Sequence, residues 1–173
     1  AAYARLCTPL LLRMADGALV HNEHDRELLR QTYGGKRIDR LELEVAPHGP
    51  YDHMSVAEQP VRDANDQVTR LLCFGLIRPY KGTEDAVLAL DLMSAEDAAD
   101  FHLTVVGETW ENWDLPAEKI AVSKYRDRID FVNRYVTDEE AANYFASADV
   151  LVLPYRRGSA SGPLHIAMAN GLH

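Results

Sequence analysis

The stretch VLVLPYRRGSASGPLHIAMANG, residues 150–171, decides the fold of this chain. Its first four residues form an apolar run that is typical of a strand buried on both faces. A helix is predicted to begin at Pro163, a residue suited to the first helical position, and to end at Asn170 before Gly171. A strand that runs into a helix in this way is the repeating unit of a parallel α/β sheet.

The start of this helix has the composition of an anion-binding turn. The segment from Ser161 to Pro163 contains no acid, and Arg156 and Arg157 lie just upstream. Unpaired backbone N–H groups and the helix dipole attract anions at such a start. Three other predicted helix starts contain carboxylates instead, at 83–85, 94–97 and 137–140. The same turn also fits an ordinary serine-capped helix without a ligand, so both interpretations stay open at this point.

The composition is that of an acidic globular protein. The chain has 173 residues, of which 47% are hydrophobic and 26% charged, and its net charge is −9. That charge argues against a nucleic-acid backbone or an anionic membrane as the main partner. Cys7 and Cys73 are the two cysteines, and we expect free thiols in a reducing compartment. No apolar run approaches the roughly 20 residues of a membrane span, so we expect a cytoplasmic protein without a transmembrane segment.

Predicted strands and helices alternate along the chain. Because strand–helix units repeat, we expect an α/β fold of Rossmann-like type, a parallel sheet with helices on both faces. Strands are predicted at 17–21, 41–46, 71–74, 102–106, 129–132 and 150–153. Helices are predicted at 25–33, 86–93, 117–125, 138–146 and 163–170. The stretch 51–69 is polar and irregular, as in a linker.

The loop after the strand at 71–74 contains two cations, Arg78 and Lys81, close to Gly75. It is not a P-loop, because the glycine before the lysine is missing, and it lacks the glycine fingerprint of dinucleotide-binding turns. On its own it could be a surface loop with solvated cations. Ligands of parallel sheets bind at the carboxyl ends of strands, where both this loop and the Ser161 turn lie. Together they predict a diphosphate site.

The loop after the strand at 129–132, Asn133-Arg134-Tyr135, lies at the same edge of the predicted sheet. It is either a contact for the base or ribose of a nucleotide or a turn before the next helix. We expect no metal site. The pair His21 and His24 has no evident third ligand, and the chain contains no Asp-x-Asp motif.

In their order along the chain, these segments resemble the family 4 glycosyltransferases, retaining enzymes with two Rossmann-like domains. The most specific match is ASADVLVLP, residues 146–154. Further matches lie at 15–20, 45–49, 74–75, 81–82, 103–107 and 167–171. The resemblance implies transfer of a sugar from a nucleotide diphosphate sugar to a sugar or glycan acceptor, with retention. It also implies glycan biosynthesis without a metal or any cofactor besides the donor substrate.

The resemblance implies roles for individual residues. Lys81 matches a lysine that contacts the diphosphate, and Arg78 is expected to replace the arginine that is usual at Leu76. Both cations would stabilise the leaving group. Donor-binding residues are expected to be Gly75, Asn133, Arg134, Tyr135, Ser159, Ser161 and Gly162.

Two glutamates of the family are missing. Their positions correspond to Gly158 and Ile166, and Ser159 and Ser161 would offer hydroxyls in their place. The missing acids leave open a non-catalytic module that binds nucleotide sugars. A nucleotide-sugar epimerase is a further alternative, but it would be expected to have acid–base carboxylates in the cleft, and Gly158 and Ile166 are not acids.

The resemblance also implies a division of the chain. Residues 1–50 are expected to be the tail of an acceptor domain and the crossover, and 51–69 a linker. Residues 70–173 are expected to be a donor-binding domain truncated at its C-terminal end. Because the acceptor would bind mainly to the other domain, we expect this chain alone to bind a nucleotide but to transfer little or no sugar.

Overall fold

The computed structural model describes residues 2–49, 51, 54, 67–158 and 161–172. The chain forms two compact units, Ala1–Gly49 and Pro50–His173, each with its own sheet and core. Ser159 and most of the predicted linker at 51–69 lie outside the described residues.

The first unit is a two-stranded parallel sheet with helices. Its strands are β1 (Gly17–Val20) and β2 (Glu42–Val45). Its helices are α1 (Ala2–Met14), α2 (Glu23–Tyr33) and α3 (Gly35–Ile38). Its buried core consists of Leu12, Ile38 and Leu41.

The second unit has a parallel sheet of four strands in the order β5-β4-β3-β6. The strands are β3 (Thr69–Phe74), β4 (Phe101–Val106), β5 (Ile129–Val132) and β6 (Val150–Leu151). β6 is two residues shorter than predicted and pairs with Leu71 and Leu72 of β3. Val152 still donates a hydrogen bond to Leu72, but the next residue on that side is Pro154, which has no N–H to donate.

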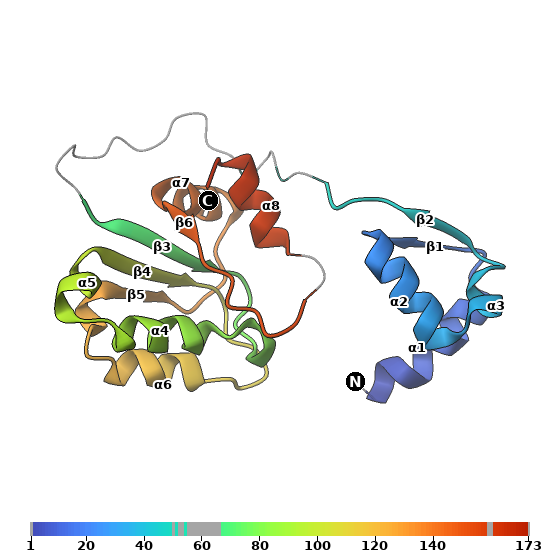
Figure 1. Ribbon diagram of the computed structural model, residues 1–173, viewed down its shortest axis with the longest axis horizontal. Coiled ribbons are helices and arrows are strands. Elements are labelled where there is room, and N and C mark those ends of the chain that lie inside the picture. The colour runs from blue at the N-terminus through green and yellow to red at the C-terminus, as the bar shows by residue number, and fades with distance from the viewer. Residues whose placement is uncertain (1, 50, 52–53, 55–66, 159–160, 173) are drawn as a thin grey trace. The chain divides into compact units, whose positions relative to one another are not determined.

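Helices cover both faces of this sheet (Figure 1). α4 (Thr83–Leu92) and α6 (Leu115–Val122) lie on one face, and α7 (Asp138–Ser147) and α8 (Gly162–Ala169) on the other. Shorter helical segments are η2 (Pro79–Lys81), α5 (Ala95–Ala99) and η3 (Arg126–Arg128). The predicted α/β fold, a Rossmann-like parallel sheet with helices on both faces, is confirmed.

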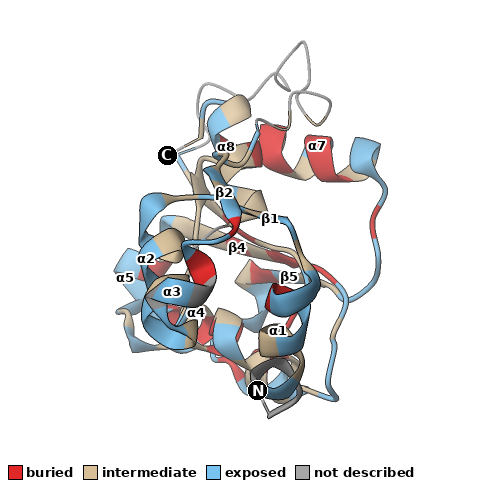
Figure 2. Cartoon of the chain, turned by 90° about the vertical axis from the view of Figure 1, so that its right-hand side faces the viewer, coloured by how far each residue is buried: buried red, intermediate tan, exposed pale blue. Residues whose placement is uncertain are grey.

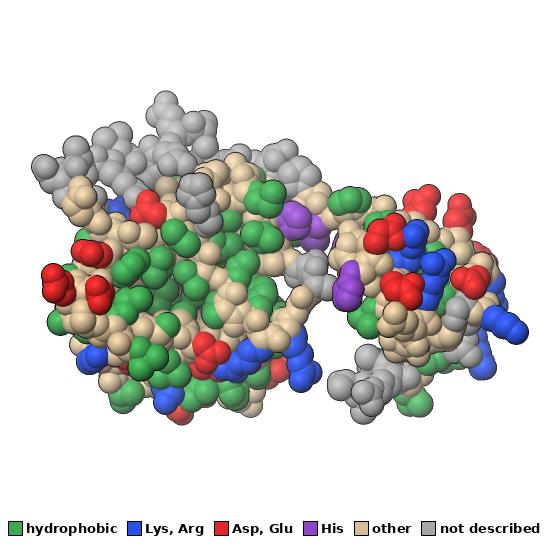
Figure 3. Space-filling view, in the orientation of Figure 1, with side chains coloured by type: hydrophobic (Ala, Val, Ile, Leu, Met, Phe, Trp, Pro, Cys, Tyr) green, Lys and Arg blue, Asp and Glu red, His purple; other side chains and the backbone are tan. Residues whose placement is uncertain are grey.

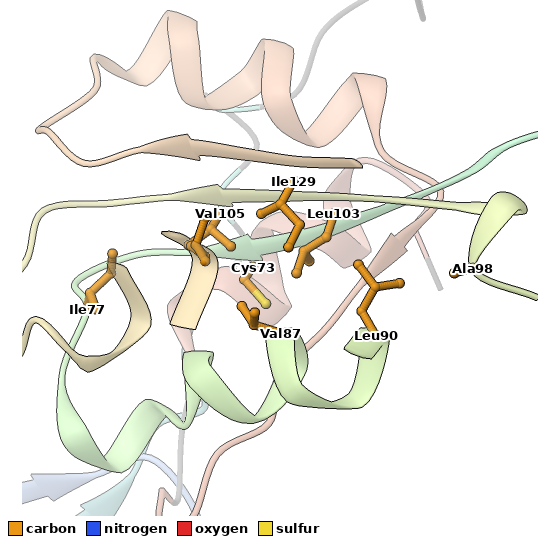
Figure 4. Close-up of a cluster of buried hydrophobic side chains, with 9 residues drawn as sticks. Cys73, Ile77, Val87, Leu90, Ala98, Leu103, Val105 and Ile129 are labelled. Carbon is orange, nitrogen blue, oxygen red and sulfur yellow. The ribbon is translucent and has the colours of Figure 1, made fainter. Parts of the chain in front are cut away.

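Each face of the sheet has its own apolar core. On the α4 side, Cys73 of β3 lies beside Val87 of α4, with Leu103 and Ile129 close by (Figure 4). Burial raises the pKa of the Cys73 thiol to about 12, so this thiol stays protonated. On the other side, Phe145 is fully buried with its ring centroid 4.9 Å from that of Phe74.

α7 shows how sequence pattern sets this packing. Thr137 and Glu140 form a capping box at its start, as the sequence predicted. Its buried residues are Ala141, Ala142, Phe145 and Ala146, whereas Asp138 and Glu139 in its first turn are exposed; Figure 2 shows the buried positions of this helix in red. The visible face of the second unit also has hydrophobic side chains grouped at its centre, with acidic side chains toward the rim (Figure 3).

Candidate functional site

The strand order reverses between β3 and β6. From β3 the chain proceeds through β4 to β5 on one side, whereas β6 pairs on the opposite side of β3. The loops that leave the carboxyl ends of these two neighbouring strands therefore run in different directions. In parallel α/β sheets, ligands bind at this reversal of strand order. The loop after β3 leads through η2 to α4, and the loop after β6 leads to α8.

A chain of polar contacts links the two loops. The Lys81 ammonium donates a hydrogen bond of 2.7 Å to the Tyr155 hydroxyl and lies 4.6 Å from the centroid of that ring. The Tyr155 hydroxyl lies 3.4 Å from Ser161 Oγ. The structure thus brings together Lys81 and Ser161, which the sequence singled out, through Tyr155, which it did not.

Gly75 allows this close arrangement. Its φ is +103°, and a Cβ at this position would lie 3.4 Å from Lys81 Nζ and 3.6 Å from Pro163 Cγ. The lysine ammonium therefore lies next to the start of α8. A side chain at position 75 would be strained by the left-handed backbone, while its Cβ would be in ordinary van der Waals contact with both groups.

The start of α8 is less open than the sequence suggested. It has no acid in its first turn, as expected, but Ser161 Oγ accepts the hydrogen bond of the Leu164 N–H. Pro163 has no N–H. An anion at this turn could accept hydrogen bonds from the Gly162 N–H and the Ser161 hydroxyl, beside the positive charge of Lys81.

Two of the expected cations are held by protein groups. Arg156 binds the carboxylates of Asp85 and Glu84, and these hydrogen bonds, first that of Asp85, raise its pKa. The Arg78 guanidinium lies 4.8 Å from the Trp110 ring centroid, and its Nε is 3.9 Å from Glu111 Oε1. Arg78 therefore packs against the loop after β4.

The loop after β5 is also fixed by neighbours. Asn133 Oδ1 accepts hydrogen bonds from the N–H and the hydroxyl of Thr109, which ties this loop to the one after β4. Arg134 forms a bidentate pair with Glu140, at 2.6 and 3.1 Å. The Arg134 guanidinium, followed by the Thr137 N–H, lowers the pKa of Glu140 to about 2. Tyr135 is 73% exposed.

A pocket of about 210 Å³ opens at this edge of the sheet. Gly75, Arg134 and Tyr135 line it together with apolar residues of β3 and α7 and with the carboxylate residues Glu108 and Asp138. Gly75 belongs both to this pocket and to the surroundings of Lys81. Three of the predicted donor-binding residues are thereby placed around one cavity next to the Lys81–Tyr155–Ser161 chain.

Within the described residues, no group of three or more His, Cys, Asp or Glu side chains could hold a metal ion. Among the helices that the structure describes, none is long and apolar enough to cross a membrane.

Comparison with protein families gives a match over most of the second unit. The sequence profile described as "Glycosyl transferases group 1" matches residues 68–173. Two forms of the GDP-mannose:glycolipid 4-beta-D-mannosyltransferase of Xanthomonas campestris pv. campestris are similar, at 33% identity over 100 residues and 34% over 103. Each match covers 58% of this chain and 28% of the relative. The matched part of this chain thus spans little more than a quarter of the length of these relatives.

Solved glycosyltransferase structures share the fold. Sucrose-phosphate synthase from Thermosynechococcus elongatus is 22% identical, with 99% of this chain and 43% of that chain covered and a TM-score of 0.74. Anabaena HepE, solved with UDP and glucose, is 15% identical, with 97% and 46% covered and a TM-score of 0.73. WaaG, a glycosyltransferase of lipopolysaccharide biosynthesis, is 21% identical, with 89% and 42% covered and a TM-score of 0.65.

Proposed function

The chain belongs to the group 1 glycosyl transferases, and from this premise we propose that its second unit binds the donor of a sugar transfer, a nucleotide diphosphate sugar. The observation that supports this most is the Lys81–Tyr155–Ser161 chain of contacts, which lies between the loops after β3 and β6. The predicted resemblance to family 4 glycosyltransferases agrees with this membership.

Lys81 would act on the leaving group. When the bond between the sugar and the diphosphate breaks, negative charge grows on the diphosphate. A fixed ammonium, a hydroxyl and a backbone N–H placed before the reaction stabilise that charge without reorganisation. Lys81, Ser161 and Gly162 supply these three groups, and the hydrogen bond to Tyr155 holds the lysine in place. Arg78 would add a second cation.

The pocket beside Gly75 would hold the nucleoside. Its apolar wall suits a planar base, and its size suits part of a nucleotide rather than a whole nucleotide sugar. The similar mannosyltransferases use GDP-mannose, so a guanine nucleotide is our first candidate. Glu108 and Asp138 both line the pocket and provide carboxylate acceptors. One carboxylate can accept hydrogen bonds from both the N1–H and the amino group of guanine.

The complete reaction, as we propose it, transfers the sugar to an acceptor bound mainly outside the second unit. Because of that division, this chain would bind donor nucleotides and transfer little sugar. The family 4 resemblance implies retention, whereas the β-mannosyl product in the name of the mannosyltransferase relatives implies inversion of an α-linked donor. A non-catalytic nucleotide-sugar-binding module is the second candidate. Ile166 favours this candidate, because this buried apolar residue, 4% exposed, occupies a position where the family 4 glycosyltransferases have a glutamate.

Calorimetry with GDP and UDP tests the donor site directly. We expect the chain to bind GDP, and Lys81→Met to weaken binding about tenfold or more, because a charge-assisted hydrogen bond is lost. Lys124→Met is the matched control. Lys124 also lies over a tyrosine, 5.0 Å from the Tyr125 ring centroid, but bonds the Met93 carbonyl away from the site. Absence of binding to both nucleotides, or equal affinity in Lys81→Met and the native chain, would refute the proposal.

Transfer is tested separately, with the full-length protein and labelled GDP-mannose. Labelled product that keeps the anomeric configuration of the donor supports a retaining transferase. Binding without any product supports the non-catalytic module instead.

A further inference from the structure

We propose that Arg156 is a positioning residue that clamps the loop after β6 onto the loop after β3, and that it does not itself contact the donor. The Arg156 clamp consists of Arg156, the carboxylates of Glu84 and Asp85, and the carbonyl of Pro79. The proposal rests on the proposed function for its ligand, but the clamp itself can be measured without any ligand.

Each nitrogen of the Arg156 guanidinium has a partner, although the side chain is 45% exposed. Its Nη2 lies 2.8 Å from both Asp85 oxygens, and its Nε donates to Asp85 Oδ2 at 3.1 Å. Its Nη1 donates to the Pro79 carbonyl at 3.0 Å and lies 2.9 Å from Glu84 Oε1. Every nitrogen of the planar fork is thus directed at the η2–α4 segment, which is the geometry that arginine provides and lysine does not.

The burial of Glu84 argues against a movement of Arg156 toward a phosphate. The Glu84 side chain is 2% exposed, and its other contact is a long hydrogen bond of 3.4 Å from Trp113 Nε1. A buried carboxylate is costly unless a cation pairs with it. If Arg156 turned toward a ligand, it would leave Glu84 buried without its cation. The observed pairing therefore favours a fixed clamp over a mobile phosphate ligand.

The backbone supports the same contact. The Arg156 N–H donates to the Tyr80 carbonyl at 2.8 Å. Gly82 lies so close to Pro154 that a Cβ at position 82 would be 2.3 Å from the Pro154 carbonyl oxygen. Two segments separated by more than seventy residues are thus joined by side-chain and backbone contacts at one place.

The clamp lies beside Lys81, one of the groups proposed to bind the diphosphate. Lys81 lies between Tyr80 and Gly82 on one segment, and Tyr155 directly precedes Arg156 on the other. The Lys81–Tyr155 hydrogen bond therefore joins neighbours of the clamp. If the clamp is released, Lys81 loses its fixed position relative to Tyr155 and Ser161, although no group that faces the ligand has been removed.

The test uses charge-matched variants of this chain with GDP as the ligand. Asp85→Ala releases most of the clamp, and Asp85 is 45% exposed, so no buried charge is left unpaired. Asp127→Ala is its control, since Asp127 is exposed, has no side-chain hydrogen bond or ion pair within the described residues and precedes β5 at the opposite end of the sheet. Arg156→Lys is compared in the same way with Arg157→Lys, whose side chain makes no described contact.

The two possible roles of Arg156 predict opposite results. A clamp predicts about tenfold weaker GDP binding in Asp85→Ala, although the chain has lost a negative charge, and a similar loss in Arg156→Lys. An arginine that contacts phosphate would be freed by Asp85→Ala, and affinity would stay or rise, which overturns the proposal. Equal losses in a variant and its control would also overturn it, because the effect would then not depend on the contacts of the clamp.

Hydrogen exchange separates failure of the clamp from failure of the proposed function. Without any nucleotide, Asp85→Ala should speed exchange of the Arg156 amide about tenfold, while Asp127→Ala leaves it unchanged. If the native chain binds no nucleotide diphosphate, the proposed function fails, but faster exchange still supports the clamp. Unchanged exchange in Asp85→Ala overturns the clamp whatever the binding result.

Discussion

Gly82 offers the clearest quantitative test of the packing between the two loops. Gly82→Ala should be compared with Gly171→Ala, because the two glycines have nearly the same left-handed φ, +63° and +69°. They differ in surroundings. A Cβ at position 82 would lie 2.3 Å from the Pro154 carbonyl oxygen, whereas nothing lies within 4 Å of one at position 171. The pair therefore separates backbone strain from steric contact.

The expected costs follow from these two terms. The left-handed backbone alone costs an alanine about 1–2 kcal/mol, which is our expectation for Gly171→Ala. At position 82 the Pro154 carbonyl must also move by at least about 0.7 Å to reach a 3.0 Å separation. Such overpacking adds about 1–3 kcal/mol, so Gly82→Ala should lose about 2–5 kcal/mol of unfolding free energy.

Urea denaturation followed by circular dichroism measures both variants against the native chain. We expect Gly82→Ala to be less stable than Gly171→Ala by about 2 kcal/mol. Nucleotide affinity should fall in Gly82→Ala only, since Lys81 is the preceding residue. Equal losses of stability in the two variants would refute the contact between Gly82 and Pro154.

Two further predictions concern titrating groups. Arg134 lowers the pKa of Glu140 to about 2, so the ionised Glu140 should stabilise the fold fully above pH 4.5 and lose this effect as the pH falls toward 2. Carbon-13 NMR of the Glu140 carboxyl should give a titration midpoint of about 2, and Arg134→Met should move that midpoint back toward 4.5. Burial raises the pKa of Cys73 to about 12, so a thiol reagent at pH 8 should label Cys7 and should not label Cys73 until the chain unfolds. The stability of the fold should also decline as the pH rises from 9 toward 12. Rapid labelling of both thiols in the folded chain would contradict this prediction.

The sequence predicted the elements whose signals are local. The strand at 129–132 agrees with β5 at both ends, and the Thr137 capping box begins α7 where expected. The apolar run at 150–153 predicted β6 but not its length, because the ladder also depends on which residue faces β3. That residue is Pro154, and the orientation becomes visible only when the register is known.

The candidate site was predictable in part for the same reason. The sequence placed Lys81 and Ser161 at carboxyl ends of strands, and strand order then brought them together. It could not identify the partners of a charge. The acids at 84 and 85 lie in the first turn of α4, as the sequence predicts, but they also bind Arg156, which the sequence places as a cation near a phosphate. Tyr155 gave no signal of its own, since an aromatic residue after a strand is usually a packing residue.

The pairing of β6 with β3 also bears on how this unit folds. β3, β4 and β5 follow one another along the chain, whereas each β3–β6 pair closes a loop of 79 residues through a ladder of two positions. Closing a loop of that length costs conformational entropy, and the short ladder gains only a few contacts in return. We therefore expect β6 to join the sheet late. Substitutions at Val150 or Leu151 should then accelerate unfolding and leave the refolding rate nearly unchanged. The candidate site between the loops after β3 and β6 would be among the last parts of the unit to form and among the first to open.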